Sequence, residues 1–208
     1  MEMNRRSFVA LTALSAAVAA PAARAASNGQ ATVGQAMRRK DRGLNQDEID
    51  FLLENTLHCV LSTCDNAGNP YGVAVSPIRL NGKFYFHCSN GASRKMANMR
   101  QNPRVSLFFI GSDKADEPVF ALNFASVIVT GTARELHDQQ QIGEIMTKLC
   151  QFQCPDGPMD YAAKHWMDDK NSMTMWEITP TAITGKARKK QRYFKNAPLG
   201  GNCKTDKA

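Results

Sequence analysis

The sequence has few of the features that mark several large classes of protein. Its longest apolar run, at residues 8–20, is too short to span a bilayer with its present flanks. The chain has no long polar tract, and its content of 43% hydrophobic and 22% charged residues excludes disorder as the main state. No internal repeat is visible. With 208 residues, the chain is long enough for one domain with a substantial core.

Acidic residues are in the minority, at 19 against 26 lysines and arginines, which gives a formal net charge of +7. A basic balance suits a nucleic acid, an anionic surface or a phosphorylated ligand. The positive residues are dispersed, apart from short groups at 37–42 and 186–190, and no nucleic-acid-binding motif accompanies them. We therefore predict no nucleic-acid partner.

Cysteines are too irregularly spaced to form a disulfide scaffold, although their even number permits disulfides in an exported protein. Cys150 and Cys154 lie four residues apart on an expected helix and could face one metal ion. Two ligands make a weak site, and no histidine pair stands nearby. We predict no metal centre, which leaves scattered thiols or one adventitious disulfide as the alternatives.

The first 26 residues are predicted to be a signal peptide rather than part of the fold. Arg5 and Arg6 precede the apolar run, and Ala23 and Ala25 supply small residues where a signal peptidase acts. The run 4–9 resembles a twin-arginine export signal, with an ordinary secretory signal as the alternative. We expect a linker at 27–36, one domain at 37–195, and a flexible tail at 196–208. The mature protein is then exported, with no membrane association beyond export.

Three helices and a series of short strands are predicted within the domain. Asn45 is a good N-cap for a helix over 45–55, because Ile49, Leu52 and Leu53 then share one face. Two further helices are expected over 93–100 and 139–152. Hairpin turns are expected at 65–69 and 81–82, and a β-bulge at Gly131. The expected strands are 57–63, 71–78, 83–88, 105–110, 121–136, 174–178 and 182–188.

Strands in hairpin succession, without regular crossover helices, favour an antiparallel barrel over a doubly wound parallel sheet. The predicted fold class is mainly β (α+β): a six-stranded antiparallel split β-barrel with flanking helices, assembled as a homodimer.

One segment combines a strand end, an Asn-Gly loop and a helix that opens on Ser93, Arg94 and Lys95. Free backbone N–H groups, a hydroxyl and two cations then converge, and a phosphate monoester is a suitable ligand for them. The alternative is a capped surface helix whose basic residues are solvated.

This segment resembles the flavin-phosphate signature of the pyridoxamine-5′-phosphate-oxidase-like split-barrel flavoproteins, in which Ser-Arg-Lys opens the helix and Asn-Pro-Arg-Val opens the next strand. Within that superfamily the chain is most similar to the 5-nitroimidazole-reductase (Nim-type) family. The similarity rests on the runs at 37–42, 68–71, 85–87, 126–131 and 183–188, which occur in the right order.

The resemblance implies a homodimer with FMN between two barrels. It assigns the phosphate to Ser93, Arg94 and Lys95, and the flavin ring to the strand that contains Val73, Ala74, Val75 and Ser76. His87 and Cys88 match a strand end that contacts the ribityl or phosphate portion, and Ser126 matches a position that approaches the flavin from the same or the second subunit. Basic residues of the vitamin oxidase are replaced here by Val73 and Ile78, so vitamin-oxidase activity is not expected.

Three further features of the sequence keep two interpretations each: a histidine, two tryptophans and a basic run. His87 could supply a proton while flavin supplies hydride, or it could be a structural histidine bonded to a carbonyl. Trp166 and Trp176 could stack on the flavin, although core packing is favoured. The basic run 186–192 could reach the phosphate, although a solvated sheet edge is favoured.

The predicted function is that of an exported FMN-dependent oxidoreductase that reduces or oxidises a small molecule, with nitro-group reduction as an analogy from the family. Its electron donor cannot be read from the sequence. One alternative is a haem-binding split-barrel protein with His58, His87, His137 or His165 as axial ligand. A second is a flavin-binding module without catalysis.

Overall fold

The computed structural model describes residues 37–158, 173–190 and 193–194. The predicted signal peptide (1–26), linker (27–36) and tail (196–208) lie outside the described residues, as do His165, Trp166 and Cys203. Within the described ranges, no helix is both long enough and apolar enough to cross a membrane.

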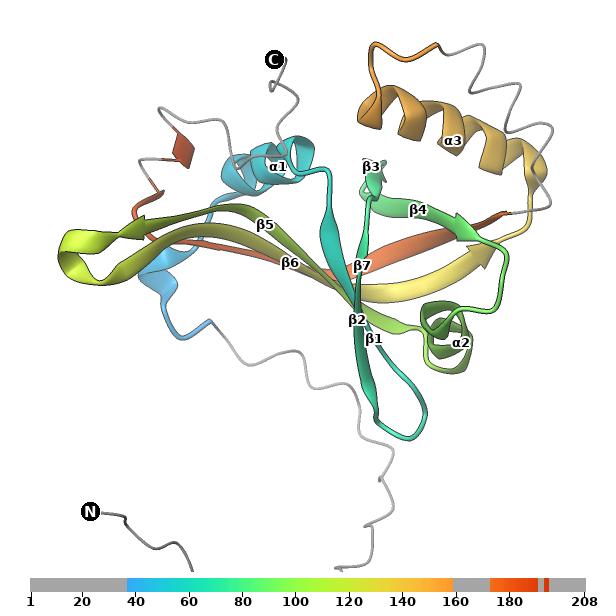
Figure 1. The fold of residues 1–208 in the computed structure, drawn as a ribbon, viewed down its shortest axis with the longest axis horizontal. Helices are drawn as coiled ribbons and strands as arrows, with labels where there is room; N and C mark the ends of the chain where they lie inside the picture. Colours follow the sequence, from blue (N-terminus) through green and yellow to red (C-terminus); the bar gives the residue numbers. More distant parts are fainter. Residues whose placement is uncertain (1–36, 159–172, 191–192, 195–208) are drawn as a thin grey trace, which may run out of the picture. The chain divides into compact units, whose positions relative to one another are not determined.

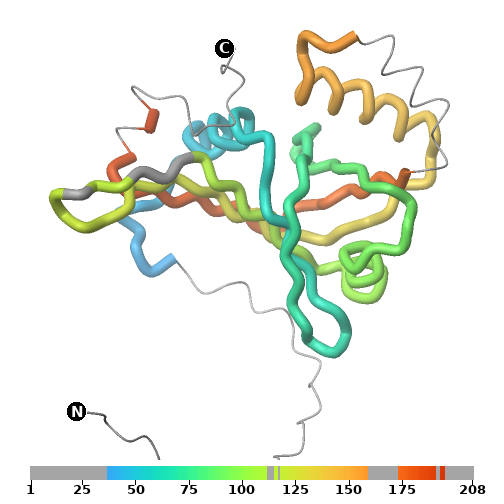
Figure 2. The backbone as a smooth tube through the Cα atoms, in the orientation of Figure 1, coloured from blue at the N-terminus to red at the C-terminus, as the bar shows by residue number. Residues whose placement is uncertain are grey.

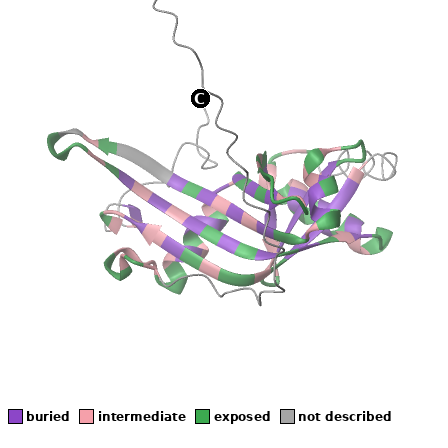
Figure 3. Cartoon of the chain, turned by 90° about the horizontal axis from the view of Figure 1, so that it is seen from below, coloured by how far each residue is buried: buried purple, intermediate pink, exposed green. Residues whose placement is uncertain are grey.

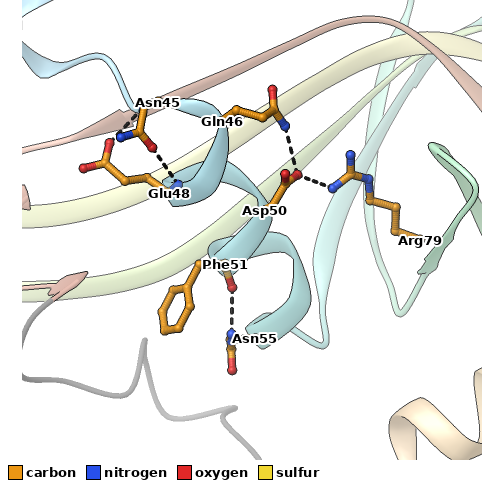
Figure 4. Close-up of polar contacts among 7 residues, drawn as sticks. All are labelled: Asn45, Gln46, Glu48, Asp50, Phe51, Asn55 and Arg79. Carbon is orange, nitrogen blue, oxygen red and sulfur yellow. Dashed lines mark hydrogen bonds and ion pairs between the residues drawn. The ribbon is translucent and has the colours of Figure 1, made fainter.

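Helix α1 (Gln46–Asn55) begins where the sequence predicts it. Figure 4 shows its capping box: the Asn45 side chain accepts from the Glu48 N–H at 2.8 Å, and the Glu48 carboxylate accepts from the Asn45 N–H at 2.8 Å. Asp50 on the same helix pairs with Arg79 of a neighbouring strand (Figure 4). Two further α-helices among the described residues are α2 (Arg94–Gln101) and α3 (Gln139–Gln153), and short 3-10 turns occur at Lys40–Arg42 and Glu117–Val119.

Seven strands of the described residues form one antiparallel sheet in the order β2-β1-β5-β6-β7-β4-β3 (Figure 1). The predicted antiparallel fold class is confirmed. The strands are β1 (Cys59–Cys64), β2 (Pro70–Val75), β3 (Ile78–Leu80), β4 (Lys83–Ser89), β5 (Arg104–Asp116), β6 (Ala121–Leu136) and β7 (Met173–Ala187).

Three details of the strands differ from the prediction. The expected strand 71–78 is two strands, because Pro77 carries no N–H for a sheet hydrogen bond and separates β2 from β3. The described sheet has seven strands, one more than the six of the predicted barrel. The two expected closing strands are instead one continuous strand, β7, which passes through Pro180. The predicted bulge is present, as the β6–β7 register shifts between Thr130 and Gly131.

Buried and exposed residues alternate along the long strands (Figure 3), which gives the sheet two distinct faces. The inward residues of β1, β5 and β6 pack with α1 and α2 in the main core. A second cluster packs α3 against Ile78, Tyr85 and Met175. Gly131 permits the close approach of β6 to β7, because a Cβ there would overlap the carbonyl oxygen of Thr179.

Strands β5 and β6 continue as a hairpin beyond the rest of the sheet (Figures 1 and 2). The turn end of this hairpin is held by Asp116, which accepts from Arg188 at 3.1 Å and also pairs with Lys189. Lys190 pairs with Glu48 of α1 at 3.2 Å. Residues 188–190 therefore form ion pairs within the fold. Lys189 is exposed, as the favoured prediction of a solvated edge requires, whereas Arg188 and Lys190 are half-buried; residues 191–192 of the predicted run lie outside the described residues.

Candidate functional site

The start of α2 carries a buried hydroxyl followed directly by two basic residues. Ser93 is the N-cap residue, with an extended backbone, yet its side chain makes no capping hydrogen bond. Within the described part of the chain, its Oγ is buried and has no hydrogen-bond partner. Buried polar atoms are nearly always satisfied in folded proteins, so an unpartnered one indicates a missing ligand or water. Arg94 and Lys95 follow directly, and no acidic residue lies in the first turn.

The first turn of α2 lies beside the β1–β2 hairpin. The Arg94 guanidinium lies over the ring of Tyr71, 5.0 Å from its centroid. Such stacking holds the guanidinium plane in place while leaving its edge free to donate. Further along the helix, the Asn98 amide donates to the Thr63 hydroxyl at 3.0 Å, and both side chains are buried. These contacts fix the position of the basic turn relative to β2.

His87 and Cys88 point to opposite faces of β4, because side chains alternate along a strand. Cys88 belongs to the main core, where burial raises the pKa of its thiol and the charge of nearby Lys95 opposes that rise. His87 pairs across the sheet with Met175, on the face that α3 covers, and burial lowers the pKa of its imidazole. The structure therefore brings Cys88, but not His87, to the side of the sheet where α2 packs.

The opposite face of β1, β2, β5 and β6 carries an exposed apolar row. Ala74 pairs with Val60, Val60 with Phe108, and Phe108 with Ile128. Val60 and Ile128 are 36% and 42% exposed, which is high for aliphatic side chains in the middle of a sheet. We refer to Ala74, Val60, Phe108 and Ile128 as the apolar row.

A mixed polar row lies next to it on the same face. Ile110 pairs with Ser126, and Ser126 pairs with Lys186. His58 and Ser76 continue this row towards β2, since each stands one residue beyond the paired residues Cys59 and Val75. Their side chains meet, with His58 Nδ1 2.7 Å from Ser76 Oγ. We refer to Ser76, His58, Ile110, Ser126 and Lys186 as the polar row.

The predicted ring-binding residues are therefore divided between the two faces. Ala74, Ser76 and Ser126 lie on the outer face, which carries the apolar and polar rows. Val75 is buried in the core and Val73 packs against it. Only the backbone of these two valines is available to a ligand on the outer face. Ser126 stands three strands from β2, on the face opposite the core into which α2 packs.

The His58–Ser76 contact was not predicted from the sequence, although the position of the first hairpin turn contains the information needed to predict it. The turn at 65–69 makes Cys64 oppose Pro70, and counting back along both strands brings His58 opposite Ser76. A third element also reaches this point, because the Gln153 amide at the end of α3 donates to the Ser76 carbonyl at 2.8 Å.

The remaining predicted positions are structural. Trp176 is 1% exposed and lies in the core, as the favoured interpretation requires. Five cysteines among the described residues are free thiols, and burial raises the pKa of the Cys59 thiol. No group of three histidine, cysteine or acidic side chains gathers as a metal site in the described ranges.

Comparison with known proteins places this geometry in a family. The family described as pyridoxamine 5′-phosphate oxidase matches residues 45–187. This range is more than half of the chain and includes every residue of the apolar and polar rows. The chain belongs to this family. The match confirms the superfamily that the motifs indicated. No curated protein sequence matches the chain.

Solved structures share the fold of this family member at low sequence identity. A candidate 5-nitroimidazole antibiotic resistance protein from Bacteroides thetaiotaomicron is 17% identical, with a TM-score of 0.57, over 70% of this chain and 86% of that one. A conserved hypothetical protein from Mycobacterium tuberculosis is 18% identical, with a TM-score of 0.63, over 79% and 98%. An FAD- and haem-binding protein from Mycobacterium smegmatis is 12% identical, with a TM-score of 0.55, over 70% and 72%.

Proposed function

We propose that this protein binds FMN and uses it to oxidise or reduce a small molecule. The observation that carries the proposal is the buried Ser93 hydroxyl, which has no partner in the described chain and opens a helix that continues with Arg94 and Lys95. A phosphate dianion at this helix N-terminus would accept from the hydroxyl, from the Arg94 fork and from free backbone N–H groups. The residues present fit a phosphate monoester.

Strand β2 links this phosphate site to the outer face. It begins near Tyr71, which lies under Arg94, and ends at the Ser76 bend. A flavin whose phosphate lies at Ser93 would extend along β2, so that Ala74 and Ser76 contact its ring. The bound flavin would supply electron or hydride transfer through N5. The chain itself would hold the phosphate, orient the ring along β2 and exclude water from it.

The proposed functional unit is a two-fold dimer. Ser126 lies on the outer face of the sheet, three strands from β2, whereas α2 with Arg94 packs on the inner face. Within one chain, a ligand along the inner face therefore cannot contact both residues. A second copy would cover the exposed apolar row and bring its own Ser126 to the flavin. Burial of Val60, Phe108 and Ile128 would also remove apolar surface from water.

The substrate would be a small molecule that reaches the open face of the flavin. The similarity to a candidate 5-nitroimidazole resistance protein supports a nitro-group acceptor as the first compound to test. We further propose that the protein acts outside the cytoplasm after twin-arginine export, because that route carries folded, cofactor-loaded proteins.

Haem is the competing ligand, since one structural neighbour is an FAD- and haem-binding protein. Among the described histidines, His58 and His137 are exposed and could offer a ring nitrogen to a haem iron. A flavin module without turnover is the other alternative. Native protein should be purified after export and its cofactor extracted: flavin absorbs in the blue and near-ultraviolet, whereas haem gives an intense Soret band.

Titration of the apo-protein with FMN and riboflavin tests the phosphate site itself. Arg94→Ala should weaken FMN binding by at least about tenfold, because charge-assisted hydrogen bonds contribute roughly 1.5–3 kcal/mol each. Riboflavin lacks the phosphate and should bind the wild type weakly, with little further loss in the variant. Arg104→Ala is the matched control, because Arg104 is exposed and its guanidinium donates to the neighbouring Asn102 side chain. Equal losses for both flavins in Arg94→Ala would contradict the proposal.

A further inference from the structure

The polar row contains a histidine–serine pair that the proposed phosphate and ring contacts do not use. His58 is exposed, immediately before β1, and its Nδ1 lies 2.7 Å from the Ser76 hydroxyl oxygen. That distance is short for a nitrogen–oxygen hydrogen bond and indicates a well-formed contact. The other ring nitrogen, Nε2, is then left for a ligand on the outer face.

Ser76 is held by more than its partner histidine. Its carbonyl accepts from the Gln153 amide at 2.8 Å, which ties the bend after β2 to the end of α3. Pro77, the next residue, is buried and has a fixed φ. The hydroxyl is therefore presented to His58 by a segment that is anchored on both sides, and the imidazole orientation is fixed in turn.

We propose that His58 is the proton-transferring residue of the flavin site and that Ser76 is its positioning residue. This inference rests on the proposed function, because it requires the flavin ring along β2. His58 and Ser76 stand on the same face as Ala74 and Ser126, whereas His87 lies on the face of β4 that α3 covers.

The chemistry balances with one hydride and one proton. Menadione, a quinone, serves here as the test acceptor. A quinone that takes a hydride from reduced FMN gains two electrons, and it needs one proton to become the hydroquinone. The His58 imidazolium would donate that proton from Nε2, leaving the N–H bonding electrons on the ring, while an oxygen lone pair of the acceptor forms the new O–H bond. The neutral ring retains its Nδ1 proton, which it donates to Ser76 Oγ before and after the transfer.

The pair makes a prediction for the apo-protein that does not depend on catalysis. Nitrogen NMR of the histidine rings should show neutral His58 held as the Nδ1–H tautomer in the wild type. Ser76→Ala should release it towards the tautomer mixture of a solvated imidazole, and Ser76→Thr, which keeps the hydroxyl, should restore the wild-type signature. An unchanged tautomer in Ser76→Ala would overturn the positioning by Ser76.

The FMN-loaded protein tests the proton transfer. After photoreduction, the rate of menadione reduction should fall about 100-fold or more in His58→Gln, since general acid catalysis typically contributes 10²–10⁴-fold. FMN affinity should stay within about twofold of the wild type. Ser76→Ala should fall to an intermediate rate and Ser76→Thr should recover it. Gln139→Ala, at an exposed residue at the start of α3 and outside both rows, is the control and should leave the rate unchanged.

The outcomes separate this inference from the proposed function. If the wild type fails to bind FMN in the titration, the proposed function is wrong and this inference fails with it. If FMN binds but His58→Gln reduces menadione at the wild-type rate, the assignment of His58 as the proton-transferring residue is wrong, whereas the proposed flavin site is not contradicted. A loss confined to His87→Gln would likewise overturn the assignment to His58.

Discussion

Replacement of Ser93 by alanine should separate stability from ligand affinity at the start of α2. An N-cap serine normally contributes about 0.5–2 kcal/mol through its side-chain hydrogen bond. Ser93 makes no such bond, so this contribution is absent. A buried hydroxyl without a partner carries a desolvation penalty of about 1–3 kcal/mol instead. Ser93→Ala should therefore leave the apo-protein as stable as the wild type or raise its Tm by a few degrees.

The affinity for FMN should change in the opposite direction. If the hydroxyl donates to the phosphate, its removal costs one hydrogen bond to a charged group, about 1.5–3 kcal/mol, which corresponds to a loss of about 10- to 150-fold. Calorimetry of the apo-protein and fluorescence titration with FMN measure the two effects separately. Riboflavin binding should be insensitive to the change.

Asp138→Ala provides the matched control at another helix start. The Asp138 carboxylate caps α3 by accepting from the N–H groups of Gln140 at 2.9 Å and Gln141 at 3.2 Å. Its loss should destabilise the protein by about 0.5–2 kcal/mol, or roughly 1–8 °C in Tm, without altering FMN affinity. If Ser93→Ala lowers Tm as Asp138→Ala does, or leaves FMN affinity intact, the reasoning about the buried hydroxyl is refuted.

Three further changes have expected outcomes of different kinds. Gly131→Ala should destabilise the fold by about 1–3 kcal/mol, because its Cβ would overlap a β7 carbonyl. Gly143→Ala, at a position on α3 with open space around it, should stabilise the fold by up to about 1 kcal/mol, and thermal unfolding of both variants compares the two effects. Burial raises the pKa of the Glu177 carboxyl, but its cationic and phenolic partners bring that pKa below the ordinary value. The charged carboxylate therefore stabilises the fold above the ordinary pKa, and this stabilisation is lost as pH falls through the folded pKa. Glu177→Gln should reduce the dependence of stability on acid pH, which urea titrations at several pH values would measure. Replacing Arg5 and Arg6 together by lysine should leave precursor inside the cell, and efficient export of that variant, followed by immunoblot, would argue against the twin-arginine route.

Local sequence signals predicted most of the elements correctly. Asn45 followed by Glu48 identified the start of α1, and the spacing of Ile142, Ile145, Met146 and Leu149 identified the buried face of α3. These signals succeed because capping and helical periodicity depend on residues a few positions apart. The Ser93-Arg94-Lys95 run was likewise found as a helix start, since its signature is contiguous.

Long-range pairing was beyond the same signals. No local pattern shows that Glu177 is buried against Tyr85, 3.0 Å from its hydroxyl, with Lys83 and Arg134 as further partners. The strand alternation that separates His87 from Cys88 was readable, but which face carries the ligand depends on where α2 and α3 pack. The ion pairs of Arg188 and Lys189 were missed for the same reason, because their partner Asp116 lies about 70 positions away along the chain.

The sheet order has a consequence for how the chain acquires its structure. Strands β3 and β4 form a local hairpin, but β4 reaches the rest of the sheet only through β7, where Phe84 pairs with Ile178. Until residues 173–187 have been synthesised, β4 and β6 both present open edges that can pair with another chain. Pairings of such long sequence separation form slowly, so the half-made sheet is exposed to aggregation for longer than a helical protein of equal size. A chain that ends before Met173 should therefore accumulate as aggregate, and β7 controls the solubility of everything made before it.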